Sequence, residues 1–514
     1  MALISDLLSA SAHLHNPMAS EEYDRRIREL VDYLKKLLST KTLDSSANDE
    51  SSLDHLDPSA DSIAYLYVLG AQIQRAQERS GNPYPADIRP AGKLWTRAAQ
   101  FLTKFDRVQV RYTGREWRQL LEVVAQASLA ASKPLLGAKL VRDAMIRLDP
   151  SATVFTSNHV LLVKLCLQAK AYSYALPILN KHICHFPTLP EPSTSEQSKI
   201  CADNASSVSF ITSASGFSSK LSYQDYLRYF LYGGMIYMAL KEWRSALHFL
   251  GAAVSMPVTS SVSLIMVEAY KKWILVGLLE KGKVSEAQRQ QCSDERFCIH
   301  MAAMLSPSIT TPHVVKLYQS LARPYVSLAQ AFERGDMKRL RGEVDAAMEI
   351  WYMDNNFGLV TQVVDAFFRQ TVVKLGKTFA ALTVADLAKQ IFPSPAEKTV
   401  TESDVSSLIM SGALDASLVQ KQDPTELSIL RFSTSLSFPR LSHELDIQSH
   451  LKKERLLMEN LVRNLEEINN AIGMSEECLD NLQRGQAWAA SNGTNPTPAE
   501  GGLEMDEDLM GDMS

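Results

Sequence analysis

Between residues 382 and 432, the spacing of apolar side chains changes from helical to alternating. A short amphipathic run starts at Thr383, a residue type that often caps helix N-termini, and a Pro-Ser-Pro break follows it. A second run with helical spacing comes next, and then two alternating segments flank a turn at Pro424. This order of elements predicts a winged helix, whose second helix carries Val405, Leu408 and Ile409 on its apolar face.

The charge of this predicted winged helix argues against a nucleic-acid ligand. Residues 382–432 hold four basic and seven acidic side chains, and no Lys or Arg occurs between Lys398 and Lys421. A recognition helix would lie in that interval, and phosphate neutralisation supplies most of the non-specific affinity for DNA. We therefore expect no nucleic-acid partner and interpret the module as a protein-binding surface. A winged-helix nucleic-acid binder is the alternative, and it would need a basic face elsewhere on the chain.

Upstream of this module, alanines in amphipathic helices recur together with prolines at the next helix boundary. Successive alanines are 37 and 71 residues apart, and removal of the serine-rich segment 188–220, which has ten serines in 33 residues, reduces the second interval to 38. A period of this length predicts stacked helical hairpins of the tetratricopeptide type. Unrelated hairpins of similar length are the alternative. The pairs are Ala138/Pro150, Ala175/Pro187 and Ala246/Pro257.

The apolar positions between residues 445 and 473 recur at alternating spacings of four and three, as in a coiled coil. A lone helix of this kind would expose an apolar stripe, so we expect it to pack against partner helices. The alternative is that it folds back on the repeats of its own chain. The candidate partner-binding residues on this seam are Ile447, Leu451, Met458, Leu461, Leu465, Ile468 and Ile472.

Composition is that of an ordinary globular protein, with 514 residues, 46% apolar residues and a net charge of −5. Six cysteines without regular spacing argue against a disulfide scaffold and favour a reducing intracellular setting. Residues 245–267 lack charged side chains, but Pro257 and several Ser and Thr residues make them a poor membrane span. We therefore expect no membrane contact.

These patterns together predict a mainly α chain in which a helical-repeat solenoid precedes the winged helix and a C-terminal coiled-coil-like helix. The expected parts are N-terminal repeats over 1–220, with loops at 41–60 and 188–220; a domain over 221–432, with a helical part over 221–381 and the winged helix over 382–432; a bundle helix over 433–485; and a disordered acidic tail over 486–514.

The candidate catalytic and metal-binding patterns all fail on spacing. Gly376-Lys377-Thr378 resembles the end of a phosphate-binding loop, but Thr371 stands where that loop needs a glycine. His13 and His15 resemble the metal pair of the JAMM isopeptidases, but the Ser and Asp that this family needs are absent. Two His/Cys groups, at 182–185 and 292–300, lack the paired short spacing of structural zinc sites. We predict no catalytic residue, no metal and no cofactor.

A helical-repeat array that leads into an acidic winged helix and then a coiled-coil helix resembles the PCI-domain proteins. These are scaffold subunits of the proteasome lid, the COP-nine signalosome and eukaryotic translation initiation factor three. Within this family, the chain is similar to the third-subunit branch of the signalosome over about residues 222–432. The segments that carry the similarity are Tyr229–Pro257, Ile265–Leu279, Asp354–Val360 and Arg369–Ile391.

The resemblance implies a non-catalytic scaffold in a complex that removes a ubiquitin-like modifier from cullins and so regulates cullin-RING ubiquitin ligases. It implies partners among other PCI subunits and JAMM/MPN subunits, and a location in the cytoplasm and nucleus. A PCI scaffold of the proteasome lid or of an initiation factor is the alternative. The last strand of the winged helix could extend a neighbour's sheet through free backbone groups. Its candidate partner-binding residues are Leu427, Ile429, Leu430 and Phe432.

Overall fold

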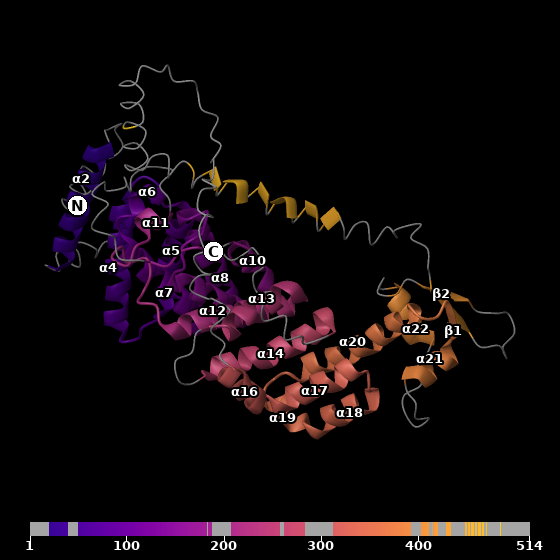
Figure 1. The fold of residues 1–514 in the computed structure, drawn as a ribbon. Helices are drawn as coiled ribbons and strands as arrows, with labels where there is room; N and C mark the ends of the chain where they lie inside the picture. The colour runs from indigo at the N-terminus through magenta and orange to yellow at the C-terminus, as the bar shows by residue number, and fades with distance from the viewer. Residues whose placement is uncertain are drawn as a thin grey trace, which may run out of the picture. The chain divides into compact units, whose positions relative to one another are not determined.

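The computed structural model divides the chain into two compact units (Figure 1). Unit 1 comprises Met1–Lys374 with Ala388–Thr399, and unit 2 comprises Leu375–Leu387 with Val400–Ser514. The residues that the structure describes are 20–39, 50–181, 183–187, 207–256, 262–282, 312–391, 402–410, 414, 416–419, 428–432, and separate helical positions between 448 and 484.

Unit 1 is built from helices throughout its described length. Their order is α2 (Ser20–Ser39), η2 (Glu50–His55), α4 (Ser62–Ser80), η3 (Ala86–Ile88), α5 (Lys93–Lys104), α6 (Arg107–Val110), α7 (Gly114–Ala130), α8 (Pro134–Leu148), α9 (Ser157–Gln168), η4 (Tyr172–Tyr174), α10 (Leu176–Leu179), α11 (Ser207–Phe210), α12 (Tyr223–Ala239), α13 (Trp243–Val254), α14 (Leu264–Lys281), α16 (Pro312–Leu321), α17 (Arg323–Arg334), α18 (Met337–Ala346), α19 (Met348–Met353) and α20 (Phe357–Gly376).

Local sequence signals explain where several of these helices begin and end. The Asp106 carboxylate accepts hydrogen bonds from two backbone N–H groups at the start of α6. Ser222 and Asp225 form a reciprocal capping box at α12. Pro134 occupies the first turn of α8, where its missing N–H costs nothing. Gly81 ends α4 with a φ of 59°, a left-handed conformation that glycine adopts without strain.

Consecutive helices pack as hairpins, which confirms the predicted helical repeat. The pairs α7/α8, α12/α13 and α13/α14 lie in contact along the stack, and Ala138, Ala175 and Ala246 are all fully buried. Close approach depends on small residues: a Cβ added at Gly234 would lie 2.8 Å from the Leu250 side chain. Small side chains at these positions let neighbouring helices bury their apolar stripes against each other.

Parts of the two predicted loops, 41–60 and 188–220, form short helices or pack against the repeats. Residues 50–55 form η2, and Leu53 and Leu56 are buried. Residues 207–219 lie against the repeats, with Phe210 and Phe217 buried. Serine and aspartate content favoured loops in both segments, but a few apolar side chains in each provide enough burial to hold them. Residues 188–206 lie outside the described part of the chain.

The elements after α20 are β1 (Ala381–Thr383), α21 (Val384–Ile391), α22 (Glu402–Met410), β2 (Ala416–Val419) and β3 (Ile429–Phe432). They belong to unit 2, except for the last turn of α21, which is assigned to unit 1. Helix, helix and hairpin follow in the predicted order, and the Asp386 N–H donates to the Thr383 hydroxyl at 3.1 Å, so Thr383 caps α21 as expected. The strand β1 was not predicted. Three residues are too short for an alternating pattern to be detected, and their pairing with β3 is a long-range contact.

The two units divide near Lys374, whereas the sequence placed a domain boundary near residue 220. Helices α12, α13 and α14 continue the stack of α7, α8 and α9, and α9 contacts α12 directly. A solenoid has no natural boundary between neighbouring repeats, because each repeat buries its apolar face on the next. The expected bundle helix at 433–485 and the tail at 486–514 fall mostly outside the described residues, so these limits stay predictions.

Candidate partner-binding surfaces

The sheet of unit 2 has β3 at its centre, in the order β1-β3-β2, with both pairings antiparallel. Leu430 pairs with Leu382 on one side and with Leu418 on the other, and its side chain is fully buried. The prediction that β3 is a free edge for a partner is therefore wrong for Ile429, Leu430 and Phe432. The missed strand β1 occupies the side that the sequence left open.

The free edges of the described sheet belong to β1 and β2. The described edge residues of β2 include Val419, which exposes 38% of its side chain. Edge strands present unpaired backbone groups that another strand can pair with. Leu427, the remaining residue of the predicted edge, lies outside the described residues.

The helix that would read a nucleic acid carries acidic residues instead. Helix α22 has Glu402 and Asp404 in its first turn and no Lys or Arg along its length. Val405 faces the core and is fully buried, whereas the Ser428 hydroxyl donates a hydrogen bond to the Glu402 carboxylate and joins α22 to β3. A surface of this charge repels phosphate.

The described residues of the C-terminal helix expose apolar side chains. Met458 and Leu465 expose 64% and 65% of their side chains, and Leu451 and Leu461 are also exposed. Val462 and Leu456 are exposed apolar residues that the heptad seam did not include. Ile447, Ile468 and Ile472 lie outside the described residues, so the seam as a whole stays a prediction.

A further apolar surface lies on α19, which the sequence pattern did not single out. Trp351 of this helix is buried, whereas its neighbours Met348, Ile350 and Tyr352 are exposed, and Met353 exposes 84% of its side chain. The short helix of six residues gives little periodicity to detect.

A buried polar network fixes α14 against the turn that precedes α20. The Lys272 ammonium is 5% exposed and donates to Asn356 Oδ1 at 3.0 Å. The Asn356 amide donates to the Tyr325 hydroxyl at 2.8 Å, and that hydroxyl donates to Asp354 Oδ2 at 2.7 Å. Burial raises the pKa of the Tyr325 phenol, so it stays a neutral donor. These contacts satisfy one another, which is typical of a structural network.

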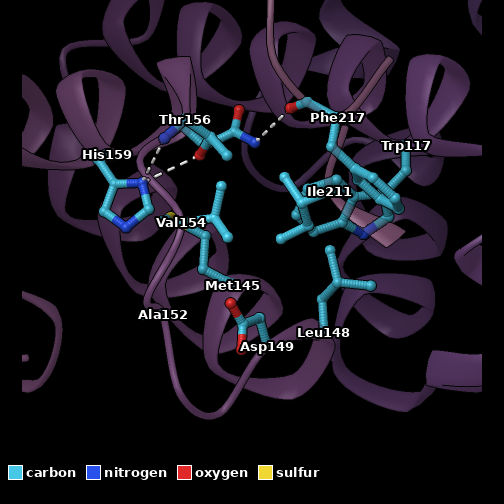
Figure 2. A pocket seen from close by; sticks show the side chains of 11 residues that line it. Trp117, Met145, Leu148, Asp149, Ala152, Val154, Thr156, His159, Ile211 and Phe217 are labelled. Carbon is cyan, nitrogen blue, oxygen red and sulfur yellow. Dashed lines mark hydrogen bonds between the residues drawn. The ribbon is translucent and has the colours of Figure 1, made fainter. Parts of the chain in front are cut away.

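Figure 2 shows a pocket in unit 1 that is lined mainly by apolar side chains, among them Met145, Val154 and Ile211. His159 also lines it. Its Nδ1 accepts from the Thr156 backbone N–H at 3.1 Å, so the neutral ring carries its proton on Nε2. Burial lowers the pKa of His159 to about 4. Neither this Nε2 nor Trp117 Nε1 has a hydrogen-bond partner within the described structure, and ordered water is the usual partner of such groups.

The remaining candidates for chemistry have structural roles or lie outside the described residues. The absent side chain of Gly376 makes room for the Phe432 ring, since an added Cβ would lie 2.7 Å from it, which explains this glycine without a phosphate. Burial raises the pKa of the Cys166 thiol to about 12, so it is not a nucleophile at neutral pH. His13 and His15 are outside the described residues.

Among the residues that the structure describes, no cluster of three or more His, Cys, Asp or Glu side chains could hold a metal ion. No helix there has the length and apolar character needed to cross a membrane.

Comparison with known proteins decides the family. Residues 24–293 match the family model of the N-terminal helical repeats of COP9 signalosome complex subunit 3. The chain is 39% identical over 494 residues to the COP9 signalosome complex subunit 3 of Emericella nidulans, which covers 95% of each chain. The chain belongs to the COP9 signalosome subunit 3 family. The Drosophila melanogaster COP9 signalosome complex subunit 3 is 25% identical over 460 residues, with 88% of this chain and 92% of that protein covered.

Membership of the COP9 signalosome subunit 3 family confirms the predicted resemblance and the helical-repeat fold. The family model spans α2 to α14, and so it includes the pocket of Figure 2 and the packed part of the serine-rich segment. The winged helix and the C-terminal helix lie beyond residue 293, where the likeness rests on the two relatives. Both relatives carry a signalosome name, and neither is named for the proteasome lid or an initiation factor.

Proposed function

We propose that this chain is a non-catalytic scaffold subunit of the COP9 signalosome. The observation that carries the proposal is the 39% identity to a signalosome subunit 3 across 95% of both chains, which leaves no large part of the chain without a counterpart. Through that complex the chain contributes to removal of the ubiquitin-like modifier from cullins and to regulation of cullin-RING ligases. The JAMM subunit carries out the catalysis, and this chain holds the other subunits in position.

The partners of the scaffold are other PCI subunits and JAMM/MPN subunits, and we place the complex in the cytoplasm and nucleus. Two surfaces support such assembly. The exposed apolar residues of the C-terminal helix, such as Met458 and Leu465, would gain burial in a bundle with partner helices. The edges of the unit 2 sheet at β1 and β2 could pair with strands of a neighbouring winged helix. The acidic helix α22 argues against a nucleic-acid partner.

Purification of the chain from its own cells tests this function. A tagged full-length chain should bring down a complex that contains a JAMM protein and that removes the modifier from modified cullin. Recovery of proteasome-lid or initiation-factor subunits would keep the fold and overturn the function. Recovery of a monomer would overturn the scaffold role, because the exposed apolar seam would then have no partner.

A further inference from the structure

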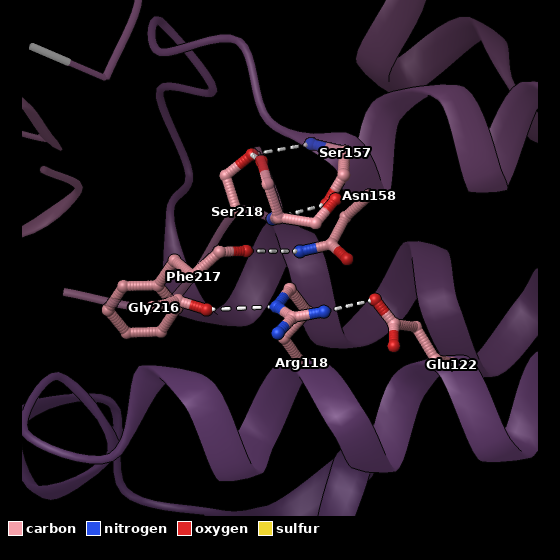
Figure 3. Close-up of polar contacts among 8 residues, drawn as sticks. Arg118, Glu122, Ser157, Asn158, Gly216, Phe217 and Ser218 are labelled. Carbon is pink, nitrogen blue, oxygen red and sulfur yellow. Dashed lines mark hydrogen bonds and ion pairs between the residues drawn. The ribbon is translucent and has the colours of Figure 1, made fainter. Parts of the chain in front are cut away.

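The strap, Ser207–Ser219, is the packed end of the serine-rich segment, and it lies across α7 and the start of α9. Figure 3 shows its polar contacts. Two side chains of the repeats donate to carbonyls of the strap: Arg118 Nε to Gly216 at 3.0 Å and the Asn158 amide to Phe217 at 3.1 Å.

At the end of the strap, Ser157 makes two further bonds. Its N–H donates to the Ser218 hydroxyl at 3.0 Å, and its hydroxyl accepts from the Ser219 N–H at 3.1 Å. The repeats therefore hold the strap as they would hold a bound peptide.

Two phenylalanines anchor the strap beneath this polar layer. Phe217 packs edge-on against Trp117, with ring centroids 5.7 Å apart. The Arg111 guanidinium lies 4.6 Å from the centre of the Phe210 ring. Trp117 is 1% exposed and Arg111 is 5% exposed. The strap thus covers an indole and a cation that its release would uncover.

A single carboxylate fastens the start of the strap. The Ser207 hydroxyl donates to Asp149 Oδ1 at 2.8 Å and lies 2.6 Å from the Ser151 hydroxyl. Asp149 Oδ1 also accepts from the Ser151 backbone N–H at 3.0 Å. Asp149 is 8% exposed and Ser207 is 6% exposed, so this contact is largely shielded from water. An ionised carboxylate only accepts hydrogen bonds, so the closed strap needs a donor at position 207.

The geometry points to Ser207 as a phosphorylation site that releases the strap, with Asp149 as the group that senses the added charge. A protein kinase would transfer the γ-phosphoryl group of a nucleoside triphosphate to Ser207 Oγ. The new O–P bond replaces the O–H bond, the proton leaves to the kinase's base, and the nucleoside diphosphate departs with the electrons of the broken P–O bond. The phosphate would then face the Asp149 carboxylate without its donor.

Repulsion between two buried anions is the physical basis of the switch. A second negative charge beside Asp149 must be removed from water, and the neighbouring Ser151 hydroxyl already donates to Asp149 Oδ1, which strongly disfavours the closed state. The kinase would act on the transiently open strap, and the phosphate would then keep the strap open. The Lys181 ammonium interacts electrostatically with Asp149. If the Lys181 ammonium instead formed an ion pair with the new phosphate, that ion pair would hold the strap closed.

Hydrogen exchange of the full-length chain, read by mass spectrometry, tests this switch. The reporters are the Ile211 N–H, which donates to the Ser207 carbonyl, and the Ser219 N–H. In Ser207→Asp these amides should exchange at least about 10-fold faster, which corresponds to a decrease of about 1.4 kcal/mol in the free energy of opening the strap. Ser213→Asp is the matched control, because Ser213 lies on the same strap with its side chain exposed. That variant should exchange like the wild type.

A double variant separates charge repulsion from simple loss of the serine. Ser207→Asp combined with Asp149→Asn should return the exchange to within about 3-fold of the wild type, because the amide introduced at position 149 can donate to the new carboxylate. Unchanged or slower exchange in Ser207→Asp overturns the switch, and so does failure of Asp149→Asn to rescue it. Absence of phosphate on Ser207 in protein from its own cells, in a digest that covers the residue, overturns the modification. These readouts do not depend on assembly into the signalosome.

Discussion

The Lys271 ammonium donates to Asp354 Oδ2 at 2.7 Å, across 83 residues of sequence. This ion pair ties α14 to the turn between α19 and α20, and Lys271 also lies 5.6 Å from the centre of the Tyr325 ring. The neighbouring Lys272–Asn356 contact completes a network that joins α14, α17 and the turn before α20. The segment that resembled the family at Asp354–Val360 thus has a structural reason for Asp354 and Asn356.

Loss of Asn356 should therefore destabilise unit 1. Asn356→Ala removes one acceptor of Lys272 and the donor to Tyr325, while Lys272 keeps its contact with Glu268 and Tyr325 keeps its contact with Asp354. We expect the free energy of unfolding to fall by about 1–3 kcal/mol, as for the loss of two buried hydrogen bonds. Urea denaturation of the full-length chain measures the change. Gln330→Ala on the exposed face of α17 is the control and should shift it by less than about 0.5 kcal/mol. Equal effects of the two would contradict the network.

Gly376→Ala should destabilise unit 2 although alanine is the better helix former. The added Cβ would lie 2.7 Å from Phe432 Cδ1, and overpacking of this kind costs about 1–3 kcal/mol. Phe432→Leu in the same chain should recover part of that loss, because the smaller side chain makes room. Thermal unfolding would show both effects. Gly358→Ala, in open space on the same helix, should be neutral or stabilising by up to about 1 kcal/mol, and a comparable loss there would refute the packing explanation.

Stability should fall in mild acid because of His159. Its folded pKa is lowered to about 4 by burial, whereas 6.5 is the ordinary value expected in the unfolded chain. The folded state therefore binds fewer protons between these values, and stability that is present above pH 6.5 is lost as pH falls to about 4. The full effect is about 3 kcal/mol. His159→Gln should flatten this dependence in urea titrations, whereas the exposed control His55→Gln should keep it. An unchanged slope in His159→Gln would show that other groups dominate.

Charged substitutions on the C-terminal helix should remove the chain from its complex without unfolding its repeats. Leu461→Asp with Leu465→Asp places two carboxylates in the apolar seam, where burial against partner helices would require their desolvation. Co-purified subunits should fall by at least about 10-fold, a loss of about 1.4 kcal/mol in binding, while the circular dichroism of the free chain stays the same. Arg463→Asp, outside the seam on the same helix, should retain them. Normal recovery with the double variant would exclude the bundle role.

Short-range patterns in the sequence were sufficient for the order of elements. Thr383 marked the start of α21, and Ala138 and Ala246 marked the helices α8 and α13, in which both alanines are buried. Ala175 is also buried, but it lies in the turn between η4 and α10 and not in a helix. Such signals depend on neighbours one or two turns apart, which the sequence itself places. The acidic character of α22 follows from its composition, so it does not depend on how the helix packs.

The edge of the sheet and the strap depended on contacts between distant residues. Leu430 looked like an edge residue until β1 paired with it through Leu382, far earlier in the sequence. Ser207 looked like one more loop serine until Asp149, 58 residues earlier, supplied its acceptor. The sequence by itself determined the helices, their repeat and the charge of the winged helix, because local periodicity and composition encode them. Only the tertiary structure decided which strand is central and which serine is buried, because those properties arise where chain segments far apart in sequence meet.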